Sequence, residues 1–323
     1  MSYLLLVLLL GLATYGLGAA AGGALLAGAW RGSRTLRGLS GARGARWLLA
    51  LRAFPPVFGL VGALLVALPA FVAHEPLDRA HGEEIGPGLV ALGLLGSLPI
   101  GLGLLRGLRA VSATRRLESR WKALARPLAL PEAGLPAARL AHPFPVAALG
   151  GFAHHRLYVA ECVLDSLTPA ELQATCAHEH AHAASRDNLK ALLLRACPDW
   201  LGLLPLGREL DQAWAGTAEQ AADDAAARSD EARAADLASA LVKTARLIPP
   251  GMQLTDLPAS SLQGGELGVR VERLLGARSR DDGGVAAAWL LAASLLALLA
   301  PLAVPGSSEL IHALLEQLVQ LVA

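Results

Sequence analysis

Four long runs of apolar residues dominate the hydropathy pattern of the chain. They cover residues 4–29, 53–73, 85–105 and 285–304, and none of them contains a charged side chain. Each run, as a helix, is long enough to cross about 30 Å of hydrocarbon, so the pattern predicts four transmembrane helices. The first run is too long, and too poor in preceding Lys or Arg, for a cleaved signal peptide, and we expect it to be retained.

The charges between these runs are distributed unevenly. Residues 31–52 contain six arginines and no acid, whereas residues 74–84 contain four acids and one arginine. Cytoplasmic loops of membrane proteins carry the excess of Lys and Arg. We therefore expect residues 31–52 and 106–282 to lie in the cytoplasm. The N-terminus, residues 74–84 and the C-terminus are expected outside.

Between the third and fourth runs the pattern changes to that of a globular domain. Short segments at 144–150 and 156–160 predict two strands. Helical periodicity predicts a helix that starts at Thr168, followed by helices at 189–204, 209–228, 231–247 and 268–275. The pattern thus divides the chain into three spans in residues 1–109, a cytoplasmic domain in 110–282, and residues 283–323. This last part holds the fourth span and an amphipathic helix at 309–322.

Composition supports the membrane assignment and narrows the partners. The chain is 54% hydrophobic and 17% charged, with a mean hydropathy of +0.46, which is typical of a membrane protein. Its net charge is only +1, and residues 106–282 hold 21 basic and 21 acidic side chains. This balance disfavours nucleic-acid binding. The three cysteines form no C-x-x-C pair, which indicates core residues in a reducing compartment.

The helix that starts at Thr168 carries the most specific chemical signal. Thr168 and Glu171 form a capping-box pattern around Pro169, which fixes the start of the helix. His178 and His182 are four residues apart, so their imidazoles share one face and can reach a single metal ion. His180 lies two residues from each and points away, and Glu179 flanks the shared face. This is the H-E-x-x-H arrangement of zinc hydrolases; the bland alternative is a helix with three surface histidines.

Two histidines leave a catalytic zinc site incomplete, because such sites use three protein ligands and one open position. Glu219, on a later predicted helix, is the candidate third ligand, and Asp223 shares its face four residues on. Asp223 is then placed to accept an N–H from a ligand histidine. The alternative for Glu219 is an ordinary solvated glutamate. Asp187 and Asn188 follow the histidine helix, and one of the two is expected to cap the next helix.

The set His178-Glu179-His180-Ala181-His182, Arg186-Asp187 and Glu219-x-x-Ala222-Asp223 resembles the integral-membrane gluzincin metallopeptidases. That group includes the CAAX prenyl-protein proteases and the HtpX quality-control proteases. The order of three spans, a zinc domain and a fourth span most resembles the BlaR/MecR-type sensor-transducer peptidases. Those proteins carry a penicillin-binding domain after the last span, whereas only about 19 residues follow Val304, so a β-lactam-sensing role is not expected.

We therefore expect a mainly α membrane protein with a cytoplasmic α+β gluzincin domain between its third and fourth spans. It would be a zinc endopeptidase of the inner or plasma membrane, with one Zn²⁺ per chain held by His178, His182 and Glu219, and with Glu179 as general base. Its partners would be the lipid bilayer and a cytoplasmic or membrane-associated protein or peptide substrate, with no nucleic acid. An HtpX-like quality-control protease is one alternative. A non-hydrolytic, zinc-stabilised signalling or scaffold protein is the other, against which an intact Glu179 argues.

Overall fold

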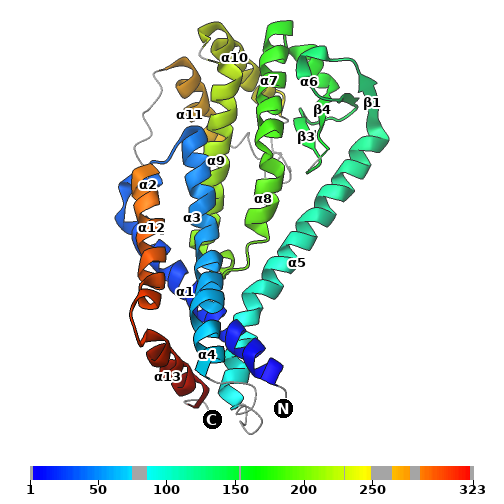
Figure 1. Ribbon diagram of the computed structural model, residues 1–323. Coiled ribbons are helices and arrows are strands. Elements are labelled where there is room, and N and C mark those ends of the chain that lie inside the picture. Colours follow the sequence, from blue (N-terminus) through cyan, green and yellow to red (C-terminus); the bar gives the residue numbers. More distant parts are fainter. Residues whose placement is uncertain are drawn as a thin grey trace.

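The computed structural model describes residues 3–74, 86–152, 154–228, 230–248, 264–276 and 284–320. The molecule is elongated, with long apolar helices at one end and a helical domain with a small sheet at the other (Figure 1). The elements of the apolar end are α1 (Tyr3–Gly32), α2 (Arg34–Arg37), α3 (Gly41–Val61), the π-helical turn η1 (Gly62–Ala67), α4 (Leu68–His74), α5 (Pro87–Leu124), α12 (Gly284–Leu299), the short 3-10 helix η7 (Ala300–Ala303) and α13 (Ser307–Gln320).

Within the described residues, four helical stretches are long and apolar enough to cross a membrane: Tyr3–Gly32, Gly41–His74, Pro87–Leu124 and Gly284–Ala303. They occur at the four places where the sequence predicts spans, so the four predicted apolar helices are present. Each of the first three is longer than its apolar run. Helix α3 already begins inside the arginine-rich segment. It continues through Pro55 and Pro56 into η1, where the helix is π-helical.

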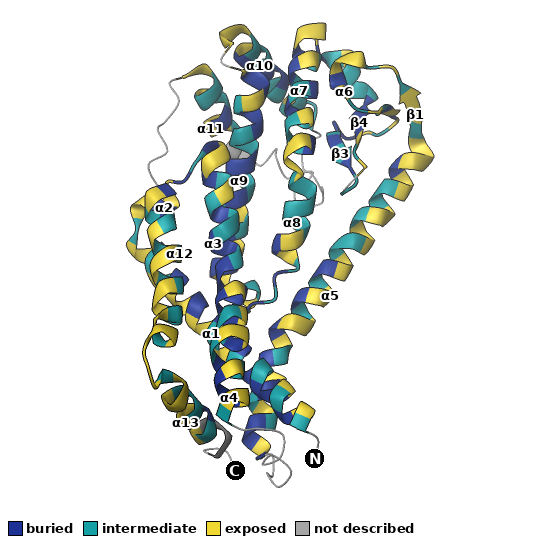
Figure 2. Ribbon diagram, in the orientation of Figure 1, coloured by how far each residue is buried: buried dark blue, intermediate teal, exposed yellow. Residues whose placement is uncertain are grey.

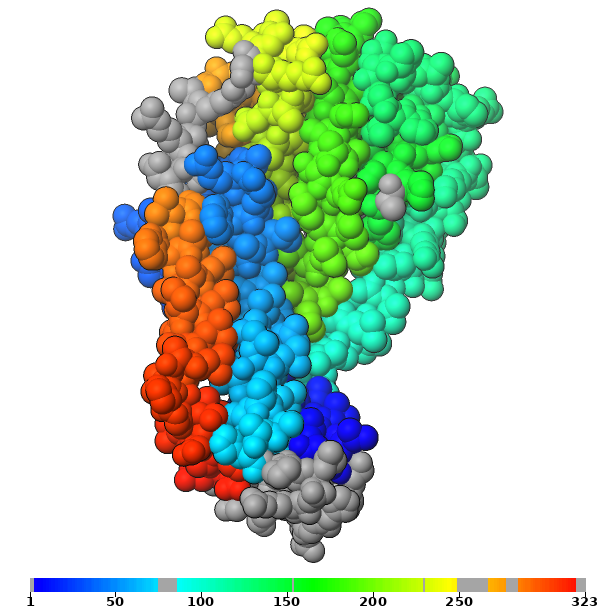
Figure 3. All heavy atoms as spheres, in the orientation of Figure 1, coloured from blue at the N-terminus to red at the C-terminus, as the bar shows by residue number. Residues whose placement is uncertain are grey.

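The first three apolar helices pack closely because glycines meet at their crossings. A Cβ atom at Gly16 of α1 would lie 2.5 Å from the Cα of Gly96 in α5. At the crossing with α3, a Cβ atom at Gly18 would lie 2.8 Å from the Cα of Gly59. Because glycine has no side chain, the helix backbones approach closely at these crossings. Close van der Waals packing of this kind can hold apolar helices together where no hydrophobic driving force acts between them. Helix α12 is different, because only 6% of its apolar stretch is buried. It lies with α13 along the outside of the bundle (Figures 2 and 3).

Helix α5 connects the apolar bundle to the second domain without a break. It runs for 38 residues and leads directly into strand β1 (Ala125–Leu128) (Figure 1). The helix therefore has no break at residue 109, where the sequence pattern predicts the boundary of the first domain. Its basic second half projects beyond the apolar run that ends at residue 105. The second half of α5 therefore separates the sheet from the apolar end of the molecule.

A four-stranded sheet follows, in the order β1-β2-β4-β3. Strands β3 and β4 pair antiparallel and fall in the two predicted strand segments, whereas β1 and β2 were not predicted. The sequences of β1 and β2, ARPL and AARL, contain no β-branched or aromatic residue, so they give little strand signal. The strands are β1 (Ala125–Leu128), β2 (Ala137–Leu140), β3 (Ala147–Gly150) and β4 (Arg156–Ala160).

The rest of the second domain is helical, and its helices pack mainly against one another. Helix α9 packs against both α7 and the apolar helix α3, so it is shared between the two ends of the molecule (Figure 1). The helices, after the single 3-10 turn η3 (Pro131–Ala133), are α6 (Glu161–Ser166), α7 (Pro169–Ser185), α8 (Asp187–Arg195), the 3-10 helix η4 (Trp200–Leu203), α9 (Pro205–Ala227), α10 (Glu231–Arg246) and α11 (Gly264–Leu275).

The helix predicted over 189–204 is wrong in its second half. Helix α8 ends at Arg195, and the chain then turns through Pro198 into η4. The carboxylate of Asp199 accepts a hydrogen bond from the N–H of Gly202 (3.0 Å), which starts the new helix instead of continuing the old one. This turn reaches into the apolar bundle, where the indole N–H of Trp200 donates to the carbonyl of Gly16 in α1.

Candidate metal centre

Helix α7 begins where the sequence predicts. The side chain of Thr168 accepts from the N–H of Glu171 (3.3 Å), and the Glu171 carboxylate accepts from the N–H of Thr168 (2.8 Å). The predicted capping box is therefore confirmed. Because the helix start is fixed, the direction of every later side chain on α7 is fixed as well.

Glu171 also ties α7 to α10. Its carboxylate accepts hydrogen bonds from Ser239 (2.6 Å) and Lys243 (2.8 Å), both on α10. Burial alone would raise the pKa of Glu171, but these hydrogen bonds and that of the cap lower it to about 2. The charged carboxylate is thus the form that joins the two helices.

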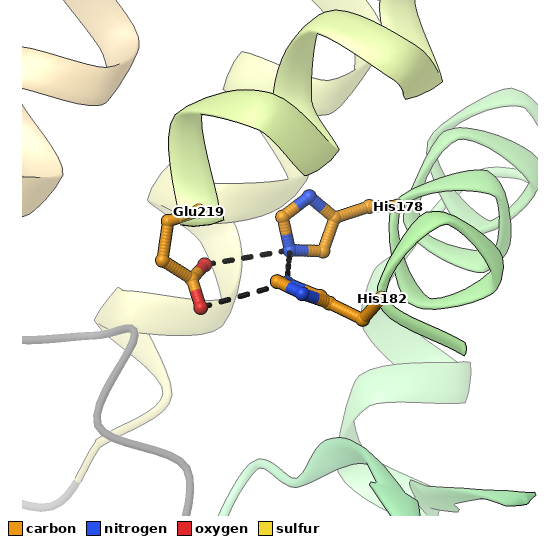
Figure 4. Close-up of side chains that lie close together, drawn as sticks. All are labelled: His178, His182 and Glu219. Carbon is orange, nitrogen blue, oxygen red and sulfur yellow. Dashed lines mark hydrogen bonds and ion pairs between the residues drawn. The ribbon is translucent and has the colours of Figure 1, made fainter. Parts of the chain in front are cut away.

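Two imidazoles and one carboxylate meet between α7 and α9. The Nε2 atoms of His178 and His182 lie 3.1 Å apart, and each lies 3.5 Å from a different oxygen of Glu219 (Figure 4). Among the described residues, these three are the cluster whose ligand atoms all lie within 4.8 Å of one another. The structure thus brings together the three residues that the sequence suggests as ligands.

The cluster fits a zinc ion by its donor types and its spacing. Two imidazole nitrogens and a carboxylate oxygen are a known donor set for catalytic zinc. Tetrahedral ligands at the usual bond lengths of about 2.0–2.1 Å are separated by roughly 3.3 Å, close to the 3.1 and 3.5 Å found here. Three protein ligands would leave a fourth position open.

The outward-facing nitrogen of each imidazole meets a carboxylate. Nδ1 of His178 lies 2.9 Å from an oxygen of Asp223, and Nδ1 of His182 lies 2.8 Å from an oxygen of Asp187. A carboxylate on Nδ1 favours the tautomer with its proton there and leaves the Nε2 lone pair for a metal. The two imidazoles are therefore oriented in the same way from opposite sides.

The position of Asp187 corrects the expectation that it or Asn188 caps α8. The N-cap of α8 is Arg186, in the left-handed conformation (φ 55°, ψ 40°), and no side-chain cap is formed. Arg186 ends α7 and separates it from α8, and the side chain of Asp187 contacts His182 of the preceding helix. Lys190 contacts the other oxygen of Asp187 at 3.0 Å and helps to hold it.

Arg270 of α11 is part of the site, and sequence reasoning missed it. Its guanidinium donates two hydrogen bonds to Asp223 (2.7 and 2.8 Å) and lies 2.9 Å from an oxygen of Glu219. The side chain is 4% exposed. It supplies positive charge to two neighbouring carboxylates, of which Asp223 is buried and Glu219 is partly exposed. The available signal was an arginine between Leu267 and Leu274, on the apolar face of a short amphipathic helix.

These contacts decide the charges of the site. Burial would lower the pKa of His182, but the contacts with Asp187 and Glu219 raise it to about 10. The pKa of Glu219 lies well below its ordinary value, because the contacts with both histidines outweigh burial. A metal ion that binds here must therefore displace protons from the imidazoles. Burial raises the pKa of Glu179, in part offset by the two histidines, which favours its taking up a proton.

Other candidate residues lie elsewhere. His180 is exposed and close to Gly134, away from the cluster, as the helix geometry predicts. Tyr158 is fully buried in the sheet core, with its ring 5.2 Å from that of Trp121. Cys176 is buried, and burial raises the pKa of its thiol to about 12, which fits a packed core residue.

Comparison with known proteins adds a family to this geometry. Residues 112–253 match the model of Peptidase family M48. Searches of curated proteins and of solved structures found no match. The matched segment contains His178, His182, Glu219 and Asp223, while Arg270 lies beyond its end. Over the segment that builds the metal cluster, this match supports the M48 metallopeptidase family for the chain.

Proposed function

We propose that the protein is a membrane-embedded zinc endopeptidase that cleaves a cytoplasmic or membrane-associated protein. The observation that carries the proposal is the convergence of His178, His182 and Glu219 beside Glu179. The match to an M48 metallopeptidase family supports it. A structural zinc site would need neither a vacant fourth position nor a neighbouring carboxylate.

In this proposal His178, His182 and Glu219 hold one Zn²⁺ per chain. When bound, zinc lowers the pKa of a coordinated water to about 7 and polarises the peptide carbonyl. Glu179 accepts the proton of the attacking water and passes it to the leaving amine. Asp223 and Asp187 keep the two imidazoles in place, and Arg270 balances the charge of Glu219 and Asp223.

The sheet offers a place for an extended substrate. Strand β3 is at the edge of the sheet and packs against α7, the helix that carries both histidines. Asn188 donates to the carbonyls of Leu149 (3.3 Å) and Gly151 (2.8 Å), so the end of β3 is already occupied. A substrate strand would therefore add at Ala147 and Ala148, where main-chain hydrogen bonds accept many sequences.

The orientation proposed for the membrane follows from charge. The arginine-rich segment 31–52 and the domain of residues 110–282 are assigned to the cytoplasm, and residues 1–109 and 283–323 carry the spans. In the structure, the amide of Gly41 at the start of α3 donates to the side chain of Gln220, next to Glu219 (3.2 Å). This contact joins the arginine-rich segment to the domain with the metal cluster, so both belong on the same side.

The physiological role has two versions. The order of spans favours a regulated, signalling peptidase of the BlaR/MecR kind, and a quality-control protease of the HtpX kind is the second candidate. Comparing the proteomes of cells that express the native chain or Glu179→Gln tests both. A few accumulating proteins with a defined cleavage site would support the first role, and many unfolded membrane proteins the second. Identical proteomes would count against a peptidase and favour a zinc-stabilised scaffold.

A further inference from the structure

A cavity of about 590 Å³ lies away from the metal cluster, between α1 and the segment that leads into α9. Its size is within the range of roughly 300–1,000 Å³ that is typical of small-molecule sites. One wall is formed by α1 from Ala20 to Arg31, and the other by Trp200 to Glu209. The residues of both walls are apolar apart from the charged side chains named below.

The cavity exists because one face of α1 carries only small side chains. Ala20, Gly23, Ala24 and Ala27 follow one another at helical spacing along this wall. At Gly23 the opposite wall comes close, since a Cβ atom there would lie 3.6 Å from Leu201. Ala20 and Ala24 are exposed, so larger side chains at these positions would project into the cavity.

Two arginines line the cavity together with these apolar residues. Arg31 is at the end of α1, and Arg37 is at the end of α2. Leu36 is 2% exposed and anchors α2, and the hydroxyl of Ser33 caps it (3.2 Å), so the position of Arg37 is set by the fold. Neither arginine pairs with a carboxylate of a described residue. With Glu209 on the other wall, the lining keeps a net positive charge.

We propose that this cavity binds one anionic phospholipid of the surrounding bilayer. One acyl chain lies along the small face of α1, against Trp200 and Leu204, and the phosphate pairs with Arg31 and Arg37. The chemistry of the cavity favours this occupant. Its apolar lining matches an acyl chain, and its two unpaired arginines, at the end of an apolar helix, match an anionic headgroup. The inference requires that the apolar helices cross a membrane and is independent of the proposed peptidase activity.

The tryptophans of the cavity provide a direct probe. Trp30 and Trp200 both line it, so a brominated acyl chain inside it would quench their fluorescence. The full chain is reconstituted in phosphatidylcholine vesicles that contain increasing fractions of brominated phosphatidylglycerol or, separately, brominated phosphatidylcholine. We expect a saturable quenching component at low fractions of the anionic lipid that the zwitterionic lipid does not reproduce. Equal quenching by both lipids would overturn the proposal.

Matched variants separate a site from general attraction to an anionic membrane. Arg31→Gln and Arg37→Gln should each raise the half-saturating lipid fraction about fivefold, because one arginine near an anionic headgroup contributes about 1 kcal/mol. Arg34→Gln is the control: it removes the same charge from an exposed position of α2 that does not line the cavity. An equal effect of Arg34→Gln would show that only surface charge matters.

A second variant tests where the acyl chain lies. Ala24→Phe should fill the cavity from an exposed position of α1 and remove the saturable component, while quenching by bulk lipid remains. The Trp200→Phe protein should lose part of the same component. If quenching is unchanged in Ala24→Phe, the lipid is not inside this cavity, and the proposal fails even if the arginines attract anionic lipid.

Discussion

Each imidazole of the metal centre is held at both of its ring nitrogens. The Nε2 atoms of His178 and His182 point at Glu219, and their Nδ1 atoms face Asp223 and Asp187. Arg270 then offsets part of the negative charge of Glu219 and Asp223. Few rotamers satisfy these contacts at once, so the site is organised before a metal or a substrate binds.

The third ligand can be tested by metal content. Glu219→Ala should remove one of three ligands, so the purified protein should retain well under the one zinc per chain expected of the native form. His178→Ala and His182→Ala should behave in the same way in elemental analysis. Asp224→Ala is the control on the same helix, because Asp224 pairs with Arg273 (2.6 Å) instead. Full zinc occupancy in Glu219→Ala would show that another residue is the ligand.

The contact of Asp187 with His182 leads to a separate prediction. Asp187→Asn keeps the shape of the side chain but weakens its hold on the imidazole, so zinc affinity should fall about 10–100-fold. Competition with a zinc chelator measures the change. Lys190→Met removes the partner of Asp187 but keeps its contact with His182. This variant should stay close to the native affinity, and a loss equal to that of Asp187→Asn would point to helix stability instead.

At the scale of elements, the site depends on the relative positions of α7, α9, α10 and α11. Helix α7 carries the histidines, α9 carries Glu219 and Asp223, and α11 carries Arg270. Glu171 links α7 to α10 through Ser239 and Lys243. Because every link includes a charged group, the arrangement should depend on pH.

The loss of folding stability at acid pH should depend on Glu171. Its pKa is about 2 in the folded protein and about 4.5 when unperturbed. Because the folded-state pKa is the lower one, the contribution is fully present above about pH 4.5 and is lost as pH falls towards 2. Thermal unfolding of Glu171→Gln should therefore show a lower Tm than the native chain at pH 6 and a similar Tm near pH 2. A constant difference at all pH values would contradict this account.

Sequence patterns predicted the elements whose signals are local. The capping box placed α7, and the i,i+4 spacing placed His178 on the same helix face as His182, and Glu219 on the same face as Asp223. Strands β1 and β2 could not be predicted, because they contain no typical strand residues and depend on pairing with β4. Asp187 and Arg270 were missed for a different reason. Their roles arise from a left-handed turn at Arg186 and from the packing of α11 on α9, neither of which a spacing rule describes.

At the scale of the whole molecule, the apolar helices pack against the domain that contains the candidate metal centre. Helix α9 packs along α3, and the buried Arg52 of α3 pairs with Asp199 and with Asp211 (3.0 Å) in the segment around the start of α9. The apolar bundle thus holds the helix that carries Glu219.

The proposed orientation is tested by cysteine accessibility. Cysteines introduced at the exposed positions Thr35 and Ala235 should be protected from a membrane-impermeant reagent in intact cells, because both lie on the cytoplasmic side. A cysteine at Ser308, exposed after the fourth span, should be labelled. The native chain controls for its own three cysteines. Labelling of the Ala235 site in intact cells would place the metal centre outside and overturn the orientation.

The central claim is that Glu179 performs base catalysis at a zinc centre in this chain. The most direct measurement compares native protein and Glu179→Gln in proteoliposomes, for zinc content and for the rate of cleavage of a substrate identified in the proteome comparison. Because Glu179 is not among the proposed ligands, the variant should keep about one zinc per chain, while cleavage falls by about 10²–10⁴-fold. A variant that binds zinc and still cleaves at the native rate would contradict the account.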